Sequence, residues 1–137
     1  MNDKGGVTAA TPRPGTIRVL LADDDEGYLG ALSELIGRQP ELTVVETATD
    51  GLGAIELADA LRPDAVVIDL HMPELDGVTA VAHLRHDHPD LCVIAITGDP
   101  DPALRRAVVD AGADDVLLKS DILDGLTRRL VALQAGS

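Results

Sequence analysis

Apolar and polar positions along the chain form five strand-like runs, each followed by a helix-like segment. The runs are rich in Val, Ile and Leu and are IRVLLA (17–22), LTVVET (42–47), AVVIDL (65–70), LCVIAIT (91–97) and DVLLK (115–119). Near-continuous apolar strands are typical of a parallel sheet that helices cover on both faces. Together with the short connections, the pattern predicts an α/β fold with a doubly wound, five-stranded parallel sheet.

The helix-like segments have apolar faces and recognisable ends. Leu29, Leu32 and Ile36 share one face of the first segment, which Gly37 and Pro40 end. Caps are expected where an aspartate precedes a helical pattern, at Asp50, at Asp76 and at Asp101, which is followed by Pro102. The last helix is expected from Ser120 or Asp121 through Leu130, with Ile122, Leu126, Leu130 and Leu133 on one stripe.

The domain organisation follows from where this pattern starts and stops. Residues 1–16 are rich in Gly, Pro and Thr without apolar periodicity, and we interpret them as a disordered N-terminal tail. Residues 17–134 form one domain, and 135–137 a short C-terminal tail. A chain of 137 residues has no room for a second domain of ordinary size.

Composition and charge narrow the possible partners. The chain has 24 Asp and Glu against 11 Lys and Arg, a net charge of -13, so direct binding to nucleic acid is not expected. Phe and Trp are absent, which leaves an aliphatic core and no aromatic platform for bases. One cysteine, no signal-peptide core and no apolar run of the roughly 20 residues that span a bilayer favour a cytoplasmic protein without membrane contact.

Charged and hydroxyl side chains gather where the predicted strands end. Asp23 and Asp24 follow the first strand, Asp69 lies at the end of the third, Thr97 ends the fourth and Lys119 ends the fifth. Asp25 follows directly after the first pair. The carboxyl ends of parallel strands share one edge of the sheet, which is where sites form in this class of fold. One aspartate alone would be a cap or loop residue, but this set points to a site.

The residue types in this set suit a metal and a phosphate. Packed carboxylates repel one another unless a cation joins them, and Mg²⁺ takes carboxylate oxygens together with waters and a phosphoryl oxygen. Lys119 is the only lysine beyond residue 4 of an otherwise Arg-favouring chain. A compact ammonium on a flexible stem is well suited to a phosphate or carboxylate.

The motifs that carry these residues resemble a known family. They are VLLADDD (19–25), VVIDLHMPELDG (66–77), IAITG (94–98) and GADDVLLK (112–119). In this order and spacing they resemble the receiver domain of two-component response regulators, the CheY-like family. Lys119-Ser120 resembles the ending of the subfamily with NarL/LuxR-type output. The resemblance implies a flavodoxin-like (βα)5 fold with strand order 2-1-3-4-5.

The resemblance also implies roles for the residues. Asp69 would be the phosphoacceptor, taking a phosphoryl group from a sensor histidine kinase or a small acyl phosphate. The implied ligands of Mg²⁺ are Asp23, Asp24, Asp69 and the backbone carbonyl of His71, and the groups that contact phosphoryl oxygens are Thr97 and Lys119. The chain would be a signalling domain rather than an enzyme, with its own Mg²⁺-dependent phosphorylation and dephosphorylation as its only chemistry. Pro73 and Gly77 would shape the loop after Asp69.

Two alternatives remain open from the sequence. The family usually has Tyr or Phe where Val116 stands, and that aromatic commonly swings inward on signalling. Valine cannot make this movement with a comparable volume, so one alternative is an interaction module that works without phosphorylation. A phosphatase of the haloacid dehalogenase type also uses Asp, Mg²⁺, Thr or Ser, and Lys. Those enzymes need a second Asp two residues after the nucleophile, where this chain has His71, so this alternative is disfavoured.

The output and the minor features are predicted less directly. Transcription would be controlled by an output domain or a partner protein, so DNA contact would not involve this chain. Val131 lies outside the stripe of the last helix and would suit a homodimer that also uses the first helix. His83, His86 and His88 are interpreted as solvated, Cys92 as a small buried apolar residue, and Tyr28 as a residue of the first helix away from any substrate site.

Overall fold

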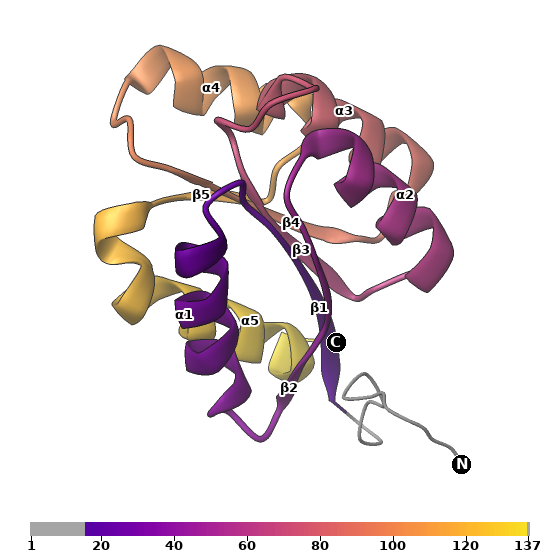
Figure 1. Ribbon diagram of the computed structural model, residues 1–137, viewed down its shortest axis with the longest axis vertical. Coiled ribbons are helices and arrows are strands. Elements are labelled where there is room, and N and C mark those ends of the chain that lie inside the picture. Colours follow the sequence, from indigo (N-terminus) through magenta and orange to yellow (C-terminus); the bar gives the residue numbers. More distant parts are fainter. Residues whose placement is uncertain (1–15, 137) are drawn as a thin grey trace.

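The computed structural model describes residues 16–136, without the side chains of residues 123, 124 and 133–136. The predicted tail therefore lies outside the described residues apart from Thr16, as do the side chain of Leu133 and residue 137. The boundaries of the domain and of both tails stay predictions. The structure has a five-stranded parallel sheet with the order β2-β1-β3-β4-β5, which confirms the predicted architecture and strand order (Figure 1).

Strands and helices alternate along the chain. The strands are β1 (Ile17–Ala22), β2 (Leu42–Ala48), β3 (Ala65–Asp69), β4 (Cys92–Thr97) and β5 (Asp115–Leu118). The helices are α1 (Glu26–Gly37), α2 (Gly51–Leu61), α3 (Gly77–Asp87), α4 (Pro102–Ala111) and α5 (Ile122–Gly136), and one 3-10 turn, η2 (Lys119–Asp121), joins β5 to α5. α5 continues past Leu130, where the apolar pattern ended the helix, because the residues that follow are mostly good helix formers.

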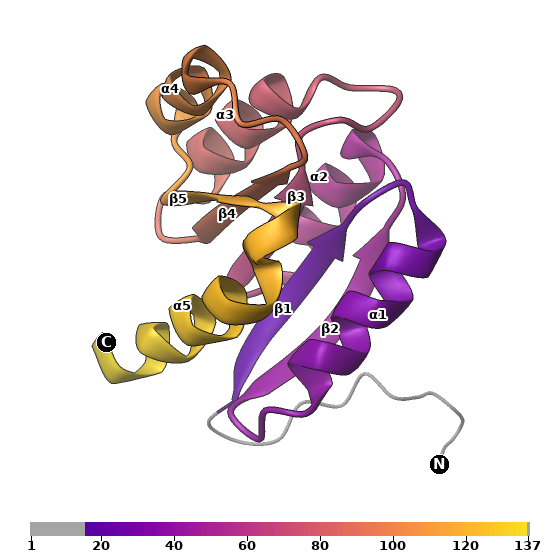
Figure 2. The ribbon, with the colours of Figure 1, turned by 90° about the vertical axis from the view of Figure 1, so that its left-hand side faces the viewer.

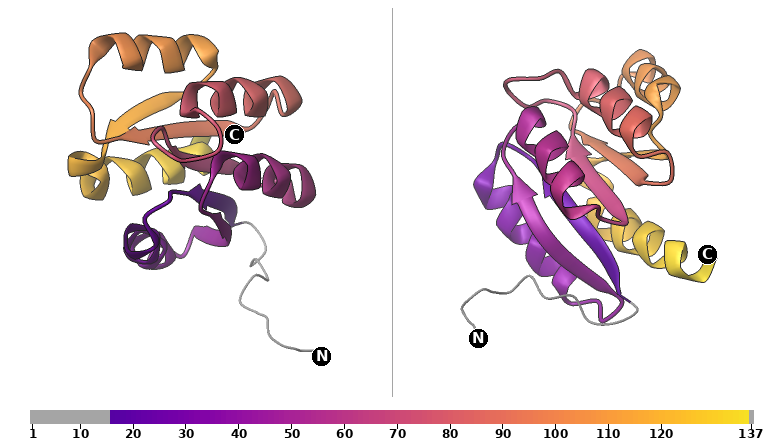
Figure 3. Two further views of the ribbon diagram at one scale, coloured as in Figure 1. Left: turned by 45° about the horizontal axis from the view of Figure 1, so that its top comes forward. Right: turned by 90° about the vertical axis from the view of Figure 1, so that its right-hand side faces the viewer.

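The helices cover the sheet in two layers, with α1 and α5 on one face and α2, α3 and α4 on the other (Figures 2 and 3). Each layer has its own aliphatic core. The first core includes Leu29, Leu32 and Ile36 from α1 and Ile122, Leu126 and Leu130 from α5. The second includes Ala54 and Ala58 from α2, Val81 and Leu84 from α3 and Val108 from α4. The two cores hold the central strands rigidly, which fixes where their carboxyl ends lie.

Aspartates cap four of the helices. The side chains of Asp25, Asp50, Asp76 and Asp101 accept hydrogen bonds from Tyr28, Gly53, Val78 and Ala103 N–H groups, respectively. Such a cap typically stabilises a helix by about 1 kcal/mol. The three caps expected from the sequence are confirmed, and Asp25, which we had grouped with the acidic site, is a cap as well.

The loop after β3 depends on a close approach at Gly77. A Cβ built at Gly77 would lie 2.5 Å from both Cα and the carbonyl oxygen of Leu70. Backbone atoms cannot give way as a side-chain tip can, so only glycine fits without a shift of the loop. Gly77 thereby holds the start of α3 against the segment that follows Asp69.

Two minor expectations need correction. Val131 is not free at the surface, because it is partly buried and packs against the core cluster between the sheet, α1 and α5. A homodimer through this residue is therefore less supported, although dimerisation itself stays a prediction. Cys92 is only partly buried, at the start of β4, and burial of the thiol raises its pKa to about 11.

The outer surface carries a few large apolar side chains. Leu52 is 49% exposed and Val109 46% exposed. Across the described part of the chain, no helix combines the length and the apolar character needed to cross a membrane.

We predict that Leu126→Ala lowers the free energy of unfolding by about 2–5 kcal/mol, because it removes a fully buried side chain between α5 and the sheet. The same change at the half-exposed Leu52 should cost less than about 0.5 kcal/mol. Urea unfolding followed by far-UV circular dichroism compares the two. Equal losses would contradict the assigned packing.

Candidate functional site

Four of the candidate site residues come together at one edge of the sheet because of strand register. Ala22 on β1 pairs with Ile68 on β3, so Asp23 and Asp69 follow side by side. Thr97, the last residue of β4, pairs with Leu118 on β5, and Lys119 follows directly. The structure therefore brings together the residues that the sequence predicted, apart from the cap Asp25.

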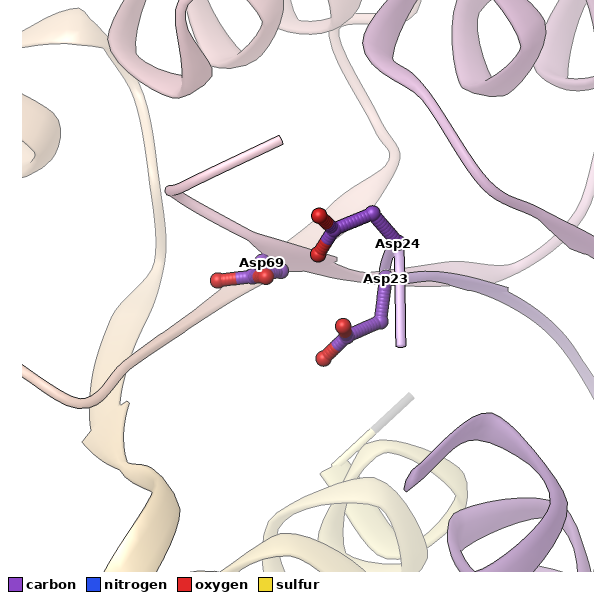
Figure 4. A group of neighbouring side chains, drawn as sticks. All are labelled: Asp23, Asp24 and Asp69. Atoms are coloured by element: carbon purple, nitrogen blue, oxygen red, sulfur yellow. The ribbon is translucent and has the colours of Figure 1, made fainter. Parts of the chain in front are cut away.

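The carboxylates of Asp23, Asp24 and Asp69 form a compact group at the ends of β1 and β3 (Figure 4). One oxygen from each lies within 4.8 Å of the others. Asp23 is 0% exposed and Asp69 2%, whereas Asp24 is open to solvent. Three oxygen ligands at this spacing, one of them facing water, fit a hard divalent cation that keeps several waters.

The pKa of Asp69 is raised above its ordinary value. Burial has the largest effect and raises the pKa. The backbone N–H of His71, which donates to Oδ1 at 3.1 Å, lowers it. The charge of Asp23 raises it again, and Lys119 lowers it. The folded state thus holds Asp69 in an environment that is unfavourable for its negative charge when no cation is bound.

Lys119 supplies the positive charge of this group. Its Nζ lies 2.8 Å from Oδ2 of Asp23 and 3.5 Å from Oδ2 of Asp69. The short contact with Asp23 is an ion pair with a buried oxygen that accepts no other hydrogen bond among the described residues. Burial of the ammonium lowers its pKa, but the contacts with Asp23 and Asp69 outweigh this and the pKa is raised. Lys119 is therefore a stable cation at neutral pH.

Tyr28 is a neighbour of the site that the sequence analysis missed. It lies in the first turn of α1, as expected, but its ring centroid is 4.5 Å from Nζ of Lys119. The position of Tyr28 four residues after Asp24 was a usable signal. A side chain one helical turn into a helix that starts at the site can reach back towards it.

Thr97 is held by two neighbours. Its hydroxyl accepts a hydrogen bond from the N–H of Asp99 at 3.0 Å and lies 3.1 Å from Nε2 of His71. Thr97 is 2% exposed, whereas His71 is exposed. A Cβ built at Gly98 would meet nothing within 4 Å, so the space beside Thr97 is open. The side chain of His71 thus contacts the site through Thr97, in addition to its backbone contact with Asp69.

Val116 is buried and leaves a small cavity next to Thr97. The cavity measures about 100 Å³ and also borders on Leu118 of β5 and Arg105 of α4. Arg105 donates a hydrogen bond from Nη1 to the carbonyl of Val116 at 2.8 Å, which ties α4 to β5. A β-branched residue thus packs where a larger side chain would have room.

The histidines near the end of α3 serve other purposes. His83 and His86 are exposed, in line with the solvated interpretation, and His86 lies 3.1 Å from Asp87. His88 differs, because its side chain is 11% exposed and its Nε2 lies 2.8 Å from Asp59 of α2. His88 therefore joins α2 to the loop after α3 instead of standing in solvent.

A family model described as the response regulator receiver domain matches residues 19–130. The chain belongs to this family.

Solved receiver structures have the same fold. The receiver domain of NarL from Mycobacterium tuberculosis superposes with a TM-score of 0.84 at 27% identity, over 90% of this chain and 100% of that one. The isolated receiver domain of RcsB from Salmonella enterica, in the presence of phosphomimetic BeF3-, superposes with a TM-score of 0.82 at 27% identity, over 89% of this chain and 91% of that one.

Relatives in sequence are longer response regulators. Response regulator MprA of Mycobacterium ulcerans is 38% identical over 120 residues, or 86% of this chain and 50% of that protein. Transcriptional regulatory protein PrrA of Mycobacterium tuberculosis is 40% identical over 116 residues, or 85% of this chain and 49% of that protein. A protein-glutamate methylesterase/protein-glutamine glutaminase of Anaeromyxobacter dehalogenans is 38% identical over 103 residues, or 75% of this chain and 30% of that protein. The receiver domain thus spans half or less of these relatives.

We predict that Asp69→Asn stabilises this receiver domain by roughly 0.5–2 kcal/mol at pH 8 in the presence of EDTA. The raised pKa means that the folded state prefers protonated Asp69, so ionisation removes stability as the pH rises from the ordinary value of 3.8 through the folded pKa. The neutral amide avoids this loss, so its advantage should shrink as the pH falls from the folded pKa towards 3.8. Urea unfolding at pH 8 and close to the ordinary value of 3.8 measures the difference, with Asp90→Asn as an exposed control. An advantage that grows on acidification would contradict the assignment.

Proposed function

We propose that this receiver domain accepts a phosphoryl group on Asp69 from a sensor histidine kinase or a small acyl phosphate. The observation that carries the proposal is the buried carboxylate of Asp69 beside that of Asp23, with the ammonium of Lys119 in contact with both. A buried nucleophilic carboxylate beside a fixed cation is what phosphoryl transfer needs, since this chemistry depends on positioning and on neutralisation of oxygen charge.

The chain's own residues have distinct roles in this reaction. An oxygen of Asp69 attacks phosphorus, the bond from phosphorus to the donor nitrogen or oxygen breaks, and the donor leaves with that electron pair. The N–H of His71 orients Asp69 through Oδ1. Lys119 and the hydroxyl of Thr97 would neutralise and bind the phosphoryl oxygens that develop charge.

Mg²⁺ is the proposed cofactor, held by Asp23, Asp24, Asp69 and the backbone carbonyl of His71. When bound, it would neutralise phosphoryl and carboxylate charge in the same place. The oxygen-only group of Asp23, Asp24 and Asp69 supports this choice, because carboxylates suit hard cations better than softer metals. Hydrolysis of the acyl phosphate would return the domain to its starting state.

The output follows from the relatives and is also a proposal. MprA is named a response regulator and PrrA a transcriptional regulatory protein, and both extend well beyond the matched region. We propose that phosphorylation of this domain controls transcription through an output domain or partner protein, in the cytoplasm, and that DNA is not contacted by this chain. Its acidic surface supports that division of labour.

We predict that the purified chain gains one phosphoryl group with acetyl phosphate and Mg²⁺, and that Asp69→Asn gains none. Lys119→Met should slow the gain by about a hundredfold, because a charge-stabilising group is lost. Intact-mass spectrometry over time measures this, with Asp90→Asn as a matched exposed control. EDTA should abolish the gain in every variant.

Two results would contradict the proposal. A folded chain that gains no mass would favour the interaction module that works without phosphorylation. Steady turnover of a phosphomonoester, lost in Asp69→Asn, would favour a phosphatase. His71 stands where such a phosphatase needs an acid, so we expect no turnover.

A further inference from the structure

Tyr28 is the chain's only aromatic residue, and it lies against the only lysine beyond residue 4. Its ring centroid is 4.5 Å from Nζ of Lys119, within the range of a cation–π contact. The Tyr28 hydroxyl is buried and has no hydrogen-bond partner among the described residues. The ring, and not the hydroxyl, is therefore the part of Tyr28 that makes a directed contact at this site.

The other contacts of Lys119 are ion pairs, whose strength depends on the charge of their carboxylate partners. Its ammonium sits on a flexible stem, and its side chain is 28% exposed. Without metal, the carboxylates of Asp23 and Asp69 attract it. A divalent cation bound to those carboxylates would neutralise them and repel the ammonium at the moment when Lys119 is needed beside the phosphoryl group.

The attraction from the ring does not depend on the state of the carboxylates. An aromatic face attracts a cation through its quadrupole, which a neighbouring metal does not remove. α1 fixes the position of the ring, because Asp25 caps the helix by accepting the N–H of Tyr28 at 3.1 Å. Tyr28 and Lys119 also line one mainly apolar cavity of about 260 Å³, together with Ala31, Leu32, Leu35, Ser120 and Ile122.

We propose that Tyr28 is a positioning residue for phosphoryl acceptance, whose ring holds the Lys119 ammonium beside Asp69 when a divalent cation occupies the carboxylates. The inference rests on the proposed function. It assigns to Tyr28 no contact with the phosphoryl group or the metal. It requires that the electron density of the ring, and not its bulk or its hydroxyl, sets the rate.

The composition of the chain allows a direct test of ring electron density. Tyr28→Phe creates the only phenylalanine in the sequence, so expression with mono-, di- or trifluorinated phenylalanine changes this position alone. Fluorine withdraws electron density from the ring face but changes its shape little. Each protein is prepared with Lys119 and with Lys119→Met, and intact-mass spectrometry gives the rate of phosphoryl gain from acetyl phosphate at saturating Mg²⁺.

We expect Tyr28→Phe to react within about twofold of wild type. Successive fluorination should slow the reaction stepwise, to a total of about three- to tenfold, the range of a partly exposed cation–π contact. In the Lys119→Met background the rate should not depend on fluorination. The Mg²⁺ concentration for half-maximal rate should stay within about twofold, because the inference assigns the ring no role in binding the metal.

Several outcomes overturn the inference. Rates that are independent of fluorination, or that fall equally in both backgrounds, show that the ring face does not act through Lys119. A tenfold loss in Tyr28→Phe alone assigns the effect to the hydroxyl. If wild type gains no phosphoryl group, the proposed function is wrong, and so is this inference, which rests on it. If wild type reacts and fluorination has no effect, only the inference fails.

Discussion

The structure depends on keeping two almost solvent-free carboxylates, those of Asp23 and Asp69, side by side. Strand register makes this unavoidable, because β1 and β3 are neighbours and end together. Their repulsion is offset by Lys119 and by backbone N–H groups, with Asp25 donating to Asp23 at 2.9 Å and His71 to Asp69 at 3.1 Å. Both stabilising contacts come from the loops immediately after the strands. The packed cores on the two faces of the sheet keep those loops in place.

This arrangement separates stability from function. The two cores stabilise the fold, whereas the site at the strand ends stores electrostatic free energy that the binding of a cation can release. Gly77 helps to hold Asp69 in place, because its close approach to Leu70 packs the start of α3 against the loop that follows Asp69. A loop that could relax would let Asp69 move towards water and lose its raised pKa. Rigid packing is therefore what keeps the carboxylate reactive towards a cation.

Much of this could be predicted from the sequence, because it depends on local pattern. Apolar runs show the strands, and aspartates before helices show the caps. The polar residues at the strand ends indicate which groups share an edge, so the sequence predicts that Asp23, Asp24, Asp69, Thr97 and Lys119 lie together, as the structure has them. The strand order came from the family resemblance, since strand pattern alone does not state which strands are neighbours.

What was missed depends on contacts between side chains of distant segments. Tyr28 and Lys119 come from different elements, and no periodicity states that one lies over the other. His88 reaches Asp59 on another helix for the same reason. Val131 was placed outside the apolar stripe by its angular position, but the sheet, α1 and α5 meet closely enough to cover it in part. The face of a helix or strand on which a side chain lies can be predicted from sequence. Contacts between side chains of different elements can be seen only in the packed structure.

Charge count explains why a dication suits this site better than a second lysine would. Asp23, Asp24 and Asp69 face one close ammonium, so the group stays negative with Lys119 in place. A second lysine would still leave the three carboxylates with an excess of negative charge, whereas a dication beside Lys119 would balance it. In the proposed reaction, a cation bound from solution would let Lys119 shift from Asp23 to a phosphoryl oxygen on Asp69, while the group gains the phosphoryl charge. The acidic surplus at this edge of the sheet is thus what would make the site respond to both a metal and a phosphoryl group.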